Sequence, residues 1–359
     1  MIPVNLDKTA VMLISYKMIT KAIISLAFLS APRYNYQTNI PHLKEGARMI
    51  LQTGLRTDIP AFYTSWFLRR LEEGFVLARN PYNPGQLTRY RLTPDVVDCI
   101  GFCTKNPAPM LPHLDKLAPF GQFWFVTITP YGVDIEPRVP PKEQVMADFR
   151  RLSAIVGPQC VAWRYDPILL TDVYTVERHL ADFASMCATL EGATDTCVIS
   201  FIDLYEKVKR NFPEIRAVRR EDRLLLGREM AAIAARHGIR LKSCCEGEEL
   251  APFGVDTSGC MTLSTYEKAL GCPLHAPKQP KTTRGCLCHL SADIGAYNTC
   301  GHGCRYCYAN YNEESVRRAM SQHDPASPLL IGHVRPGECI RDAVQTSWRR
   351  EQIGFDELL

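Results

Sequence analysis

The chain of 359 residues lacks the features that identify several large classes of protein. It has no run of about eighteen uncharged apolar residues, so a membrane-spanning helix is not expected. It also lacks a glycine-rich phosphate loop, a G-x-S-x-G nucleophile turn, an H-E-x-x-H zinc motif and a dinucleotide fingerprint. Its net charge of +4 is small for this length and argues neither for nor against nucleic acid.

Cysteine, in contrast, is abundant, with fifteen residues in the chain. A short secreted protein uses such a number for disulfides, but in an enzyme-sized chain the pattern favours metal ligands and buried thiols. The apolar stretch from Val11 to Ala31 is interrupted by Lys17 and Lys21. The uninterrupted apolar run after Lys21, Ala22 to Leu29, is too short to span a bilayer. The stretch therefore predicts a peripheral helix or an N-terminal extension rather than an export signal. We therefore expect a reducing, cytoplasmic location and no membrane partner.

Three cysteines near the C-terminus have the spacing of an iron–sulfur site. Cys300, Cys304 and Cys307 are four and three residues apart, and thiolates are the soft anionic ligands that such clusters require. Three thiolates can hold three corners of a [4Fe–4S] cube and leave the fourth iron open. The alternatives are three buried thiols, or a zinc knuckle completed by His302 or Cys288.

A second set of cysteines lies upstream of this motif and consists of Cys244, Cys260, Cys286 and Cys288. Four thiolates can complete either an auxiliary [4Fe–4S] cluster or a structural zinc site. Cys286 and Cys288 are two residues apart, so both can point at one metal from an extended segment. Cys245 and Cys272 compete for the same role, and each of these residues can instead be a small buried side chain.

Apolar segments alternate with helical patterns from Met49 onward. The strand-like runs cover residues 49–53, 75–78, 97–102, 123–128, 160–163, 197–201 and 239–241, and the helical patterns cover residues 142–156, 175–191 and 222–237. Strand, helix and strand at this spacing imply a parallel sheet with right-handed crossovers. We therefore predict an α/β fold with a TIM-barrel-like (β/α) barrel, complete or incomplete, whose eighth strand comes from residues 329–334 or from the N-terminal extension.

This pattern divides the chain into three regions. Residues 1–48 form an N-terminal extension, residues 49–250 form the (β/α) barrel, and residues 251–359 form a cysteine-rich iron–sulfur region packed on the barrel. Strand-like runs are confined almost entirely to the second region, and the three-cysteine motif lies in the third.

Polar side chains follow nearly every predicted strand. The carboxyl ends of the strands of a (β/α) barrel share one rim, so these side chains are expected to converge on a single polar mouth. The candidate catalytic residues at this mouth are Arg56, Asp58, Lys105, Arg164, Asp166 and Asp203. The alternative is that Arg56 with Asp58, and Arg164 with Asp166, are structural ion pairs or turn caps. These residues predict the position of an active site for a small-molecule substrate, but they do not identify that substrate.

Basic residues are frequent between Lys207 and Arg223, with Tyr205 and Phe212 among them. Such a strip can bind phosphates and stack nucleic-acid bases. Four acidic residues dilute its charge, so a solvated loop and helix start is the preferred interpretation. Nucleic acid is accordingly not expected as a partner.

The three-cysteine motif resembles the signature of the radical S-adenosylmethionine (SAM) enzymes, and residues 300–309 are similar to the corresponding loop of spore photoproduct lyase-like proteins. The resemblance implies that the open iron binds SAM and cleaves it reductively to a 5'-deoxyadenosyl radical, which abstracts hydrogen from the substrate. It also implies a reductant such as ferredoxin or flavodoxin. Tyr306, near the SAM adenine, and Asn298 are the candidate cofactor contacts.

The chain also resembles an uncharacterised prokaryotic family catalogued as a domain of unknown function, through residues 56–63, 80–84, 103–107, 163–168, 200–205 and 293–300. That family implies no reaction. In radical SAM enzymes the cysteine loop follows the first barrel strand, whereas here only 52 residues follow Cys307. Either the barrel is permuted or the cluster serves another purpose. The alternatives are electron transfer without SAM, and nucleic-acid binding with a structural metal.

Overall fold

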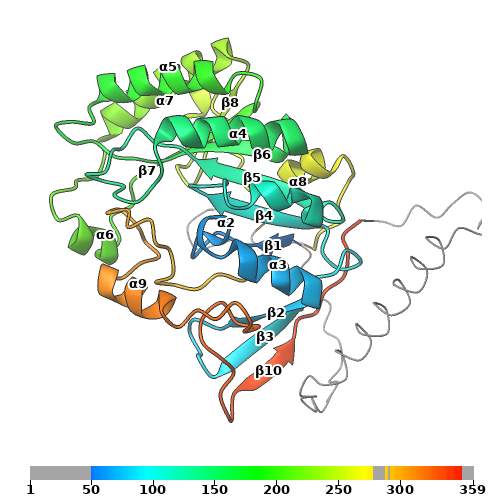
Figure 1. Ribbon diagram of the computed structural model, residues 1–359. Helices are drawn as coiled ribbons and strands as arrows, with labels where there is room; N and C mark the ends of the chain where they lie inside the picture. The colour runs from blue at the N-terminus through cyan, green and yellow to red at the C-terminus, as the bar shows by residue number, and fades with distance from the viewer. Residues whose placement is uncertain (1–49, 278–287, 290–291, 350–359) are drawn as a thin grey trace, which may run out of the picture. The chain divides into compact units, whose positions relative to one another are not determined.

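The computed structural model describes residues 50–277, 288–289 and 292–349 (Figure 1). All of them belong to one compact unit, Glu45–Leu359. The predicted N-terminal extension, residues 1–48, lies outside the described residues, as does Cys286.

The main sheet is parallel and has seven strands in the order β8-β7-β6-β5-β4-β1-β9. Its strands are β1 (Ile50–Gln52), β4 (Cys99–Thr104), β5 (Gly121–Thr127), β6 (Val161–Ile168), β7 (Thr196–Phe201), β8 (Arg240–Ser243) and β9 (Ala292–Asp293). Most of these strands are buried along nearly their whole length, as expected for a parallel sheet covered by helices. The mixed α/β fold with a parallel sheet is confirmed.

The sheet is open where a barrel would close. Among the described residues β8 and β9 are its two edges, and no ladder joins them. The strand beyond β1 comes from the cysteine-rich region, because Leu51 pairs with Ala292 and Gln52 with Asp293. Residues 329–334, one of the two segments expected to supply an eighth strand, do not take this place, since Leu329 makes an isolated bridge to Leu77. The other segment, the N-terminal extension, lies outside the described residues.

The predicted barrel strand at residues 75–78 instead belongs to a second sheet. β2 (Phe75–Arg79) pairs antiparallel with β3 (Gln86–Arg91), and β10 (Cys339–Asp342) pairs parallel with β3. The physical reason is the short link between β2 and β3. Residues 80–85 contain two prolines, two asparagines and a glycine, which make a tight turn and leave no room for the helix of a parallel crossover.

The three predicted helices are present and begin and end close to the predicted positions, as α4, α5 and α7. The described α-helices are α2 (Ile59–Phe62), α3 (Thr64–Glu73), α4 (Lys142–Val156), α5 (Val176–Leu190), α6 (Glu206–Asn211), α7 (Arg220–Arg236), α8 (Leu263–Leu270) and α9 (Glu313–Met320), with short 3-10 helices at Leu111–Leu117, Pro158–Cys160 and Ala251–Phe253. α4 starts after Pro141 and stops at Gly157, and the side chain of Thr175 caps α5. α4, α5 and α7 pack side by side against the strands (Figure 1).

The core lies between these helices and the sheet. Phe149 of α4 and Phe183 of α5 are fully buried, and the ring of Phe183 stacks on Trp163 of β6 at 4.9 Å between centroids. Such packing fixes the strands and therefore the loops that follow their carboxyl ends. No helix in the described ranges is long and apolar enough to cross a membrane.

Candidate functional site

A cavity of about 550 Å³ lies at the carboxyl edge of the parallel sheet. Its wall includes residues at or just after the carboxyl ends of six of the seven strands, and it includes all six candidate catalytic residues named from the sequence. The side chains of Cys300, Cys304 and Cys307 line the same cavity. The structure therefore brings the cysteine motif and the rim of the sheet to one place, although they are far apart in the sequence.

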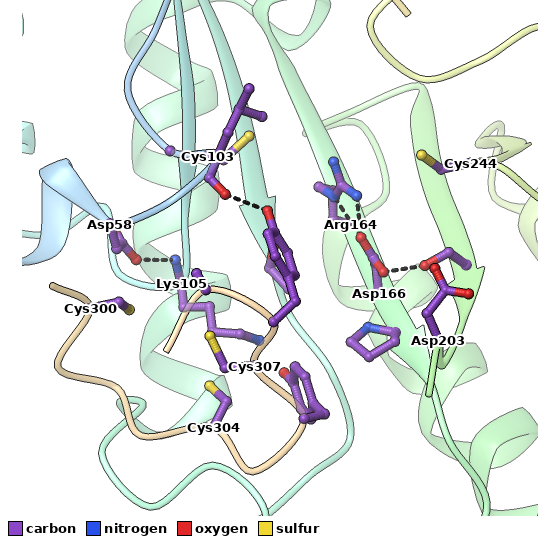
Figure 2. A pocket seen from close by; sticks show the side chains of 18 of the residues that line it. Asp58, Cys103, Lys105, Arg164, Asp166, Asp203, Cys244, Cys300, Cys304 and Cys307 are labelled. Carbon is purple, nitrogen blue, oxygen red and sulfur yellow. Dashed lines mark hydrogen bonds and ion pairs between the residues drawn. The ribbon is translucent and has the colours of Figure 1, made fainter. Parts of the chain in front are cut away.

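The cavity has two walls of different composition (Figure 2). Cys300, Cys304 and Cys307 lie on one side with Asp58 and Lys105. The opposite side carries Arg164, Asp166, Asp203 and Cys244. The first wall is formed by the cysteine segment and the loops after β1 and β4. The second is formed by β6, which itself carries Arg164 and Asp166, and by the loops after β7 and β8.

The backbone of the cysteine segment is held in place by the loop that follows β5. The Arg305 amide donates to the Ile135 carbonyl at 3.0 Å, and the Arg138 amide donates to the His302 carbonyl at 3.1 Å. The Arg138 side chain also donates to the carbonyl of Gly301 at 2.6 Å. A side chain at Gly301 would be too close to Phe62, because its Cβ would lie 2.8 Å from the ring. The segment therefore packs directly on α2.

Asp58 joins three parts of the cavity wall. Its Oδ1 accepts a hydrogen bond from the Ala61 amide and caps α2. Its Oδ2 accepts from the Lys105 amide at 2.8 Å and lies 2.8 Å from His302 Nε2. The carboxylate is buried and has three polar partners, so its place in the structure is that of an organising group between Cys300 and the β4 loop.

Lys105 forms a buried ion pair beside the motif. Its Nζ lies 2.8 Å from Glu136 Oε1, and Glu136 also accepts hydrogen bonds from Thr129 and Tyr306. Burial acts to lower the pKa of Lys105, but the carboxylate of Glu136 and the nearby Cys304 outweigh it and shift that pKa upward. Burial likewise acts to raise the pKa of Glu136, and Lys105 reverses the effect. Both groups are therefore charged.

Tyr306 is the candidate cofactor contact whose ring lines the cavity. Its hydroxyl donates to Glu136, and the ring is almost fully buried. Asn298, the other candidate, is absent from the cavity wall. It has a positive φ of 60°, and its amide donates to the Ala309 carbonyl at 3.1 Å while its side chain accepts from the Tyr311 amide. Asn298 thus closes the base of the cysteine loop.

The remaining cations of the rim are also paired. Arg56 contacts Asp293 of β9 at 2.5 Å, and not Asp58. Arg164 pairs with Asp166, as the ion-pair interpretation anticipated, and Asp166 accepts a further hydrogen bond from Ser200. The Tyr205 hydroxyl donates to Asp203 at 3.2 Å. Each of these cations at the described rim therefore lies beside a carboxylate.

Glu246 is a cavity residue that is absent from the sequence-derived set of catalytic candidates. Burial raises its pKa to about 7, while a hydrogen bond from the Phe201 amide acts to lower it. Asp203 and Asp166 add to the increase. In the sequence, the only indication of a role for Glu246 was its position after a predicted strand. Its ionisation depends on burial that the sequence does not show.

The thiols of the motif are buried and close enough to influence one another. Burial raises the pKa of Cys300, and the neighbouring charges of Asp58, Cys307 and Cys304 raise it further. Burial likewise raises the pKa of Cys304 and of Cys307, and Lys105 opposes the increase at both. Without a cation the three groups are thiols, and a bound metal would supply the positive charge that deprotonates them.

Three members of the second cysteine set also meet. Cys260 Sγ lies 3.4 Å from Cys244 Sγ and 3.4 Å from Cys288 Sγ. Cys245 Sγ lies 4.0 Å from Cys244 Sγ. Hydrogen bonds from Cys245, Cys260 and Cys288 hold the pKa of Cys244 well below its usual range. The fourth predicted ligand, Cys286, lies outside the described residues.

Neither cysteine group has the finished geometry of a metal site. Within the residues that the structure describes, no group of three or more His, Cys, Asp or Glu side chains is already arranged to hold a metal ion. Any metal bound at either place would require the sulfurs to move from their present positions.

The basic strip makes local contacts. Lys207 Nζ lies 4.7 Å from the ring centre of Tyr297, and the Arg210 guanidinium lies 4.2 Å from that of Tyr311. Lys207 also donates to the Tyr308 carbonyl at 3.1 Å. Other members pair with acidic side chains, as Lys209 with Glu206, Arg219 with Asp222, and Arg220 and Arg223 with Glu249. These contacts place α6 against the cysteine segment.

The chain is similar to one protein family and, more weakly, to a solved structure. A solved structure with some likeness is the carboxyl transferase domain from Rhizobium etli pyruvate carboxylase, at 11% identity and a TM-score of 0.24, covering 82% of this chain and 51% of that one. The chain thus spans about half the length of that structure. No curated protein matches the chain. Residues 50–309 match the family described as "Domain of unknown function (DUF1848)", and the chain belongs to that family.

Proposed function

We propose that the protein is an iron–sulfur enzyme of the radical SAM type, with a [4Fe–4S] cluster on Cys300, Cys304 and Cys307. The observation that carries the proposal is the position of these side chains, which line the same cavity as the carboxyl ends of the parallel strands. In an open parallel sheet this edge is where ligands bind. A cluster held there would face an enclosed space large enough for a small molecule.

The three cysteines suit a cluster better than a single ion. Ligands of a cube bind different irons and are therefore spread apart, whereas ligands of one ion nearly touch. The motif thiols affect one another through charge, while sulfur contacts of 3.4 Å among the described residues occur at Cys244, Cys260 and Cys288. When bound, such a cluster with one open iron would supply the electron that cleaves SAM reductively.

The surrounding residues would position this group and keep water away. Asp58 holds His302 and the Lys105 amide, which ties the cysteine loop to the loop after β4. Lys105 opposes the rise in the pKa of Cys304 and of Cys307, so it would balance part of the thiolate charge. Tyr306 lines the same cavity and is fixed through Glu136.

The second wall would bind the substrate. Asp166 and Asp203 lie opposite the cysteines, Glu246 lines the same cavity, and Arg164 is already paired with Asp166. This distribution suits amino or hydroxyl groups of a small molecule better than a phosphate or a carboxylate. The reductant would be a ferredoxin or a flavodoxin.

The proposal is tested with the full chain, reconstituted anaerobically with iron and sulfide. We expect about four cluster irons per chain, an EPR signal after dithionite reduction that changes on adding SAM, and release of 5'-deoxyadenosine. Cys304→Ala should lose all three. Cys103→Ala, which alters another cavity cysteine outside the motif, should keep them. A protein that binds no cluster would refute the proposal, and a cluster that ignores SAM would leave only an electron-transfer role.

A further inference from the structure

The second cysteine group lies at the opening of the sheet. Cys244 and Cys245 directly follow β8, and Cys288 lies four positions before β9. Among the described residues these two strands are the first and the last of the main sheet, and the outer side of β8 makes one isolated bridge, from Lys242 to Asp256. Cys260 comes from the loop before α8, and its sulfur lies 3.4 Å from those of Cys244 and Cys288. The sulfur atoms therefore bring together segments that adjoin the two edge strands.

The backbone brings a fourth sulfur into the group. Consecutive residues of an extended chain point in opposite directions. Cys245 departs from this pattern because its φ is 61°, in the left-handed region that costs a non-glycine residue about 1–2 kcal/mol. In this conformation its sulfur lies 4.0 Å from that of Cys244. Backbone strain is common at functional sites, and the strain at Cys245 is explained if both sulfurs bind the same ligand.

The surroundings of the sulfurs resemble those of metal-bound thiolates. Cys260 is 3% exposed and Cys288 is 6% exposed. The backbone amide of Met261 donates to Cys288 Sγ at 3.2 Å, which stabilises negative charge on that sulfur. Cys244 is partly buried and Cys245 is exposed. Two buried sulfurs, one of them with an amide donor, suit anionic sulfur.

The sulfur separations favour one ion over a cube. Sulfurs on a tetrahedral zinc, about 2.3 Å from the metal, lie about 3.8 Å apart. The sulfur–sulfur separations here are 3.4 Å, 3.4 Å and 4.0 Å. The described side chains are not yet arranged around a metal position, but small shifts of the thiols would form such a site. The ligands of an iron–sulfur cube bind separate irons and need wider spacing.

We propose that Cys244, Cys245, Cys260 and Cys288 bind one structural zinc ion that links the β8 and β9 edges of the sheet. This site is independent of the cluster proposed at the motif. The ion takes the place of the strand pairing that would close a barrel, and it fixes Cys244 and Cys245 in the cavity wall. Four-thiolate sites of this kind keep no open position, so the ion has no part in catalysis.

The test uses the full chain carrying Cys300→Ala, Cys304→Ala and Cys307→Ala, which removes the motif and separates the two proposals. Elemental analysis after purification with zinc should give about one zinc per chain. Cobalt in its place should give the intense visible bands of a tetrahedral thiolate complex. Adding Cys260→Ala should abolish both signals. Adding Cys197→Ala instead, at an equally buried cysteine of β7, should leave them unchanged.

Two further variants test the fourth ligand. In the same background Cys245→Ser should weaken zinc binding and change the cobalt spectrum, whereas Cys286→Ser should do neither. Amide exchange at residues 240–243 and 292–293 should slow about 100-fold when zinc is present at about 100 times its dissociation constant. That protection should be absent in the Cys260→Ala variant. No zinc in the motif-free chain, iron in its place, or a requirement for Cys286 instead of Cys245 would overturn the assignment.

Discussion

The Nε2 atom of His302 lies 2.8 Å from Oδ2 of Asp58, and through this contact the cysteine segment is attached to the first helix of the sheet domain. His302 stands between Cys300 and Cys304 in the sequence, so the contact holds the segment that joins these two cysteines. The ring also packs edge-on against Phe62 at 4.7 Å between centroids. Three predictions concern these and neighbouring contacts, and a fourth concerns His179.

The contact between Asp58 and His302 should be measurable as an interaction free energy between the two side chains. Asp58→Ala should lower the free energy of unfolding by about 1 kcal/mol through the lost helix cap and by about 1–3 kcal/mol through buried donors left unsatisfied. Denaturation in urea of Asp58→Ala, His302→Ala and the double variant forms a mutant cycle. We expect an interaction energy of about 1–3 kcal/mol. Purely additive effects would mean that the two side chains do not interact.

The ion pair between Lys105 and Glu136 should behave as a buried pair. Lys105→Met leaves the Glu136 carboxylate uncompensated and should cost about 3–5 kcal/mol of unfolding free energy. Lys105→Met combined with Glu136→Gln should be more stable than Lys105→Met alone, because no isolated charge remains. Chemical denaturation checks both. A double variant less stable than either single variant would contradict the assignment.

Gly301 should be needed for space beside α2. Its Cβ would lie 2.8 Å from the Phe62 ring, so Gly301→Ala should push the cysteine loop away, cost about 1–3 kcal/mol through overpacking and reduce the iron bound after reconstitution. Phe62→Leu should partly restore iron binding in the Gly301→Ala background, since it opens the contact. If iron content is unaffected by Gly301→Ala, the loop does not depend on this packing.

His179 should make the fold sensitive to mild acid. Burial lowers its pKa below 6.5, and its ring nitrogens lie 2.7 Å from the Tyr165 hydroxyl and 2.8 Å from the Leu169 carbonyl. The unfolded chain then binds a proton at a higher pH than the folded one. The stabilisation that neutral His179 contributes to the fold is complete above about pH 6.5. It is lost as the pH falls toward the pKa of His179 in the folded chain, and the free energy of unfolding then changes with a slope approaching about 1.4 kcal/mol per pH unit.

The check for His179 is the pH dependence of urea unfolding, compared between the native chain and His179→Gln. Glutamine can keep one of the two hydrogen bonds and does not titrate. The native chain should lose more stability than the variant between neutral pH and about pH 5.5. Parallel curves would show that His179 does not titrate differently on folding.

The parallel sheet was predictable because its central strands are continuous apolar runs and its helices have clear ends. α4 spans Lys142–Val156 as predicted, since Pro141 and Gly157 bound it. β9 could not be predicted, because a two-residue strand has no hydrophobic pattern and depends wholly on pairing with β1. β2 was misassigned because periodicity identifies a strand but not the sheet to which it belongs.

The place of the candidate site was also predictable, but the roles of its residues were not. The rim residues and the motif cysteines share one cavity, as the strand order implied. That Asp58 contacts His302, 244 positions away, and that Arg56 pairs with Asp293 instead of Asp58, depend on the folded arrangement. Glu136 gave no signal in the sequence, because its importance comes from burial beside Lys105.

The pairing of β9 with β1 also sets when the cavity can form during synthesis. Arg56 and Asp293 meet although they are 237 positions apart, so the cavity wall stays incomplete until the chain has been made beyond Asp293. Contacts of such long range form slowly. The cluster that we propose could therefore be bound only after most of the described chain has been synthesised.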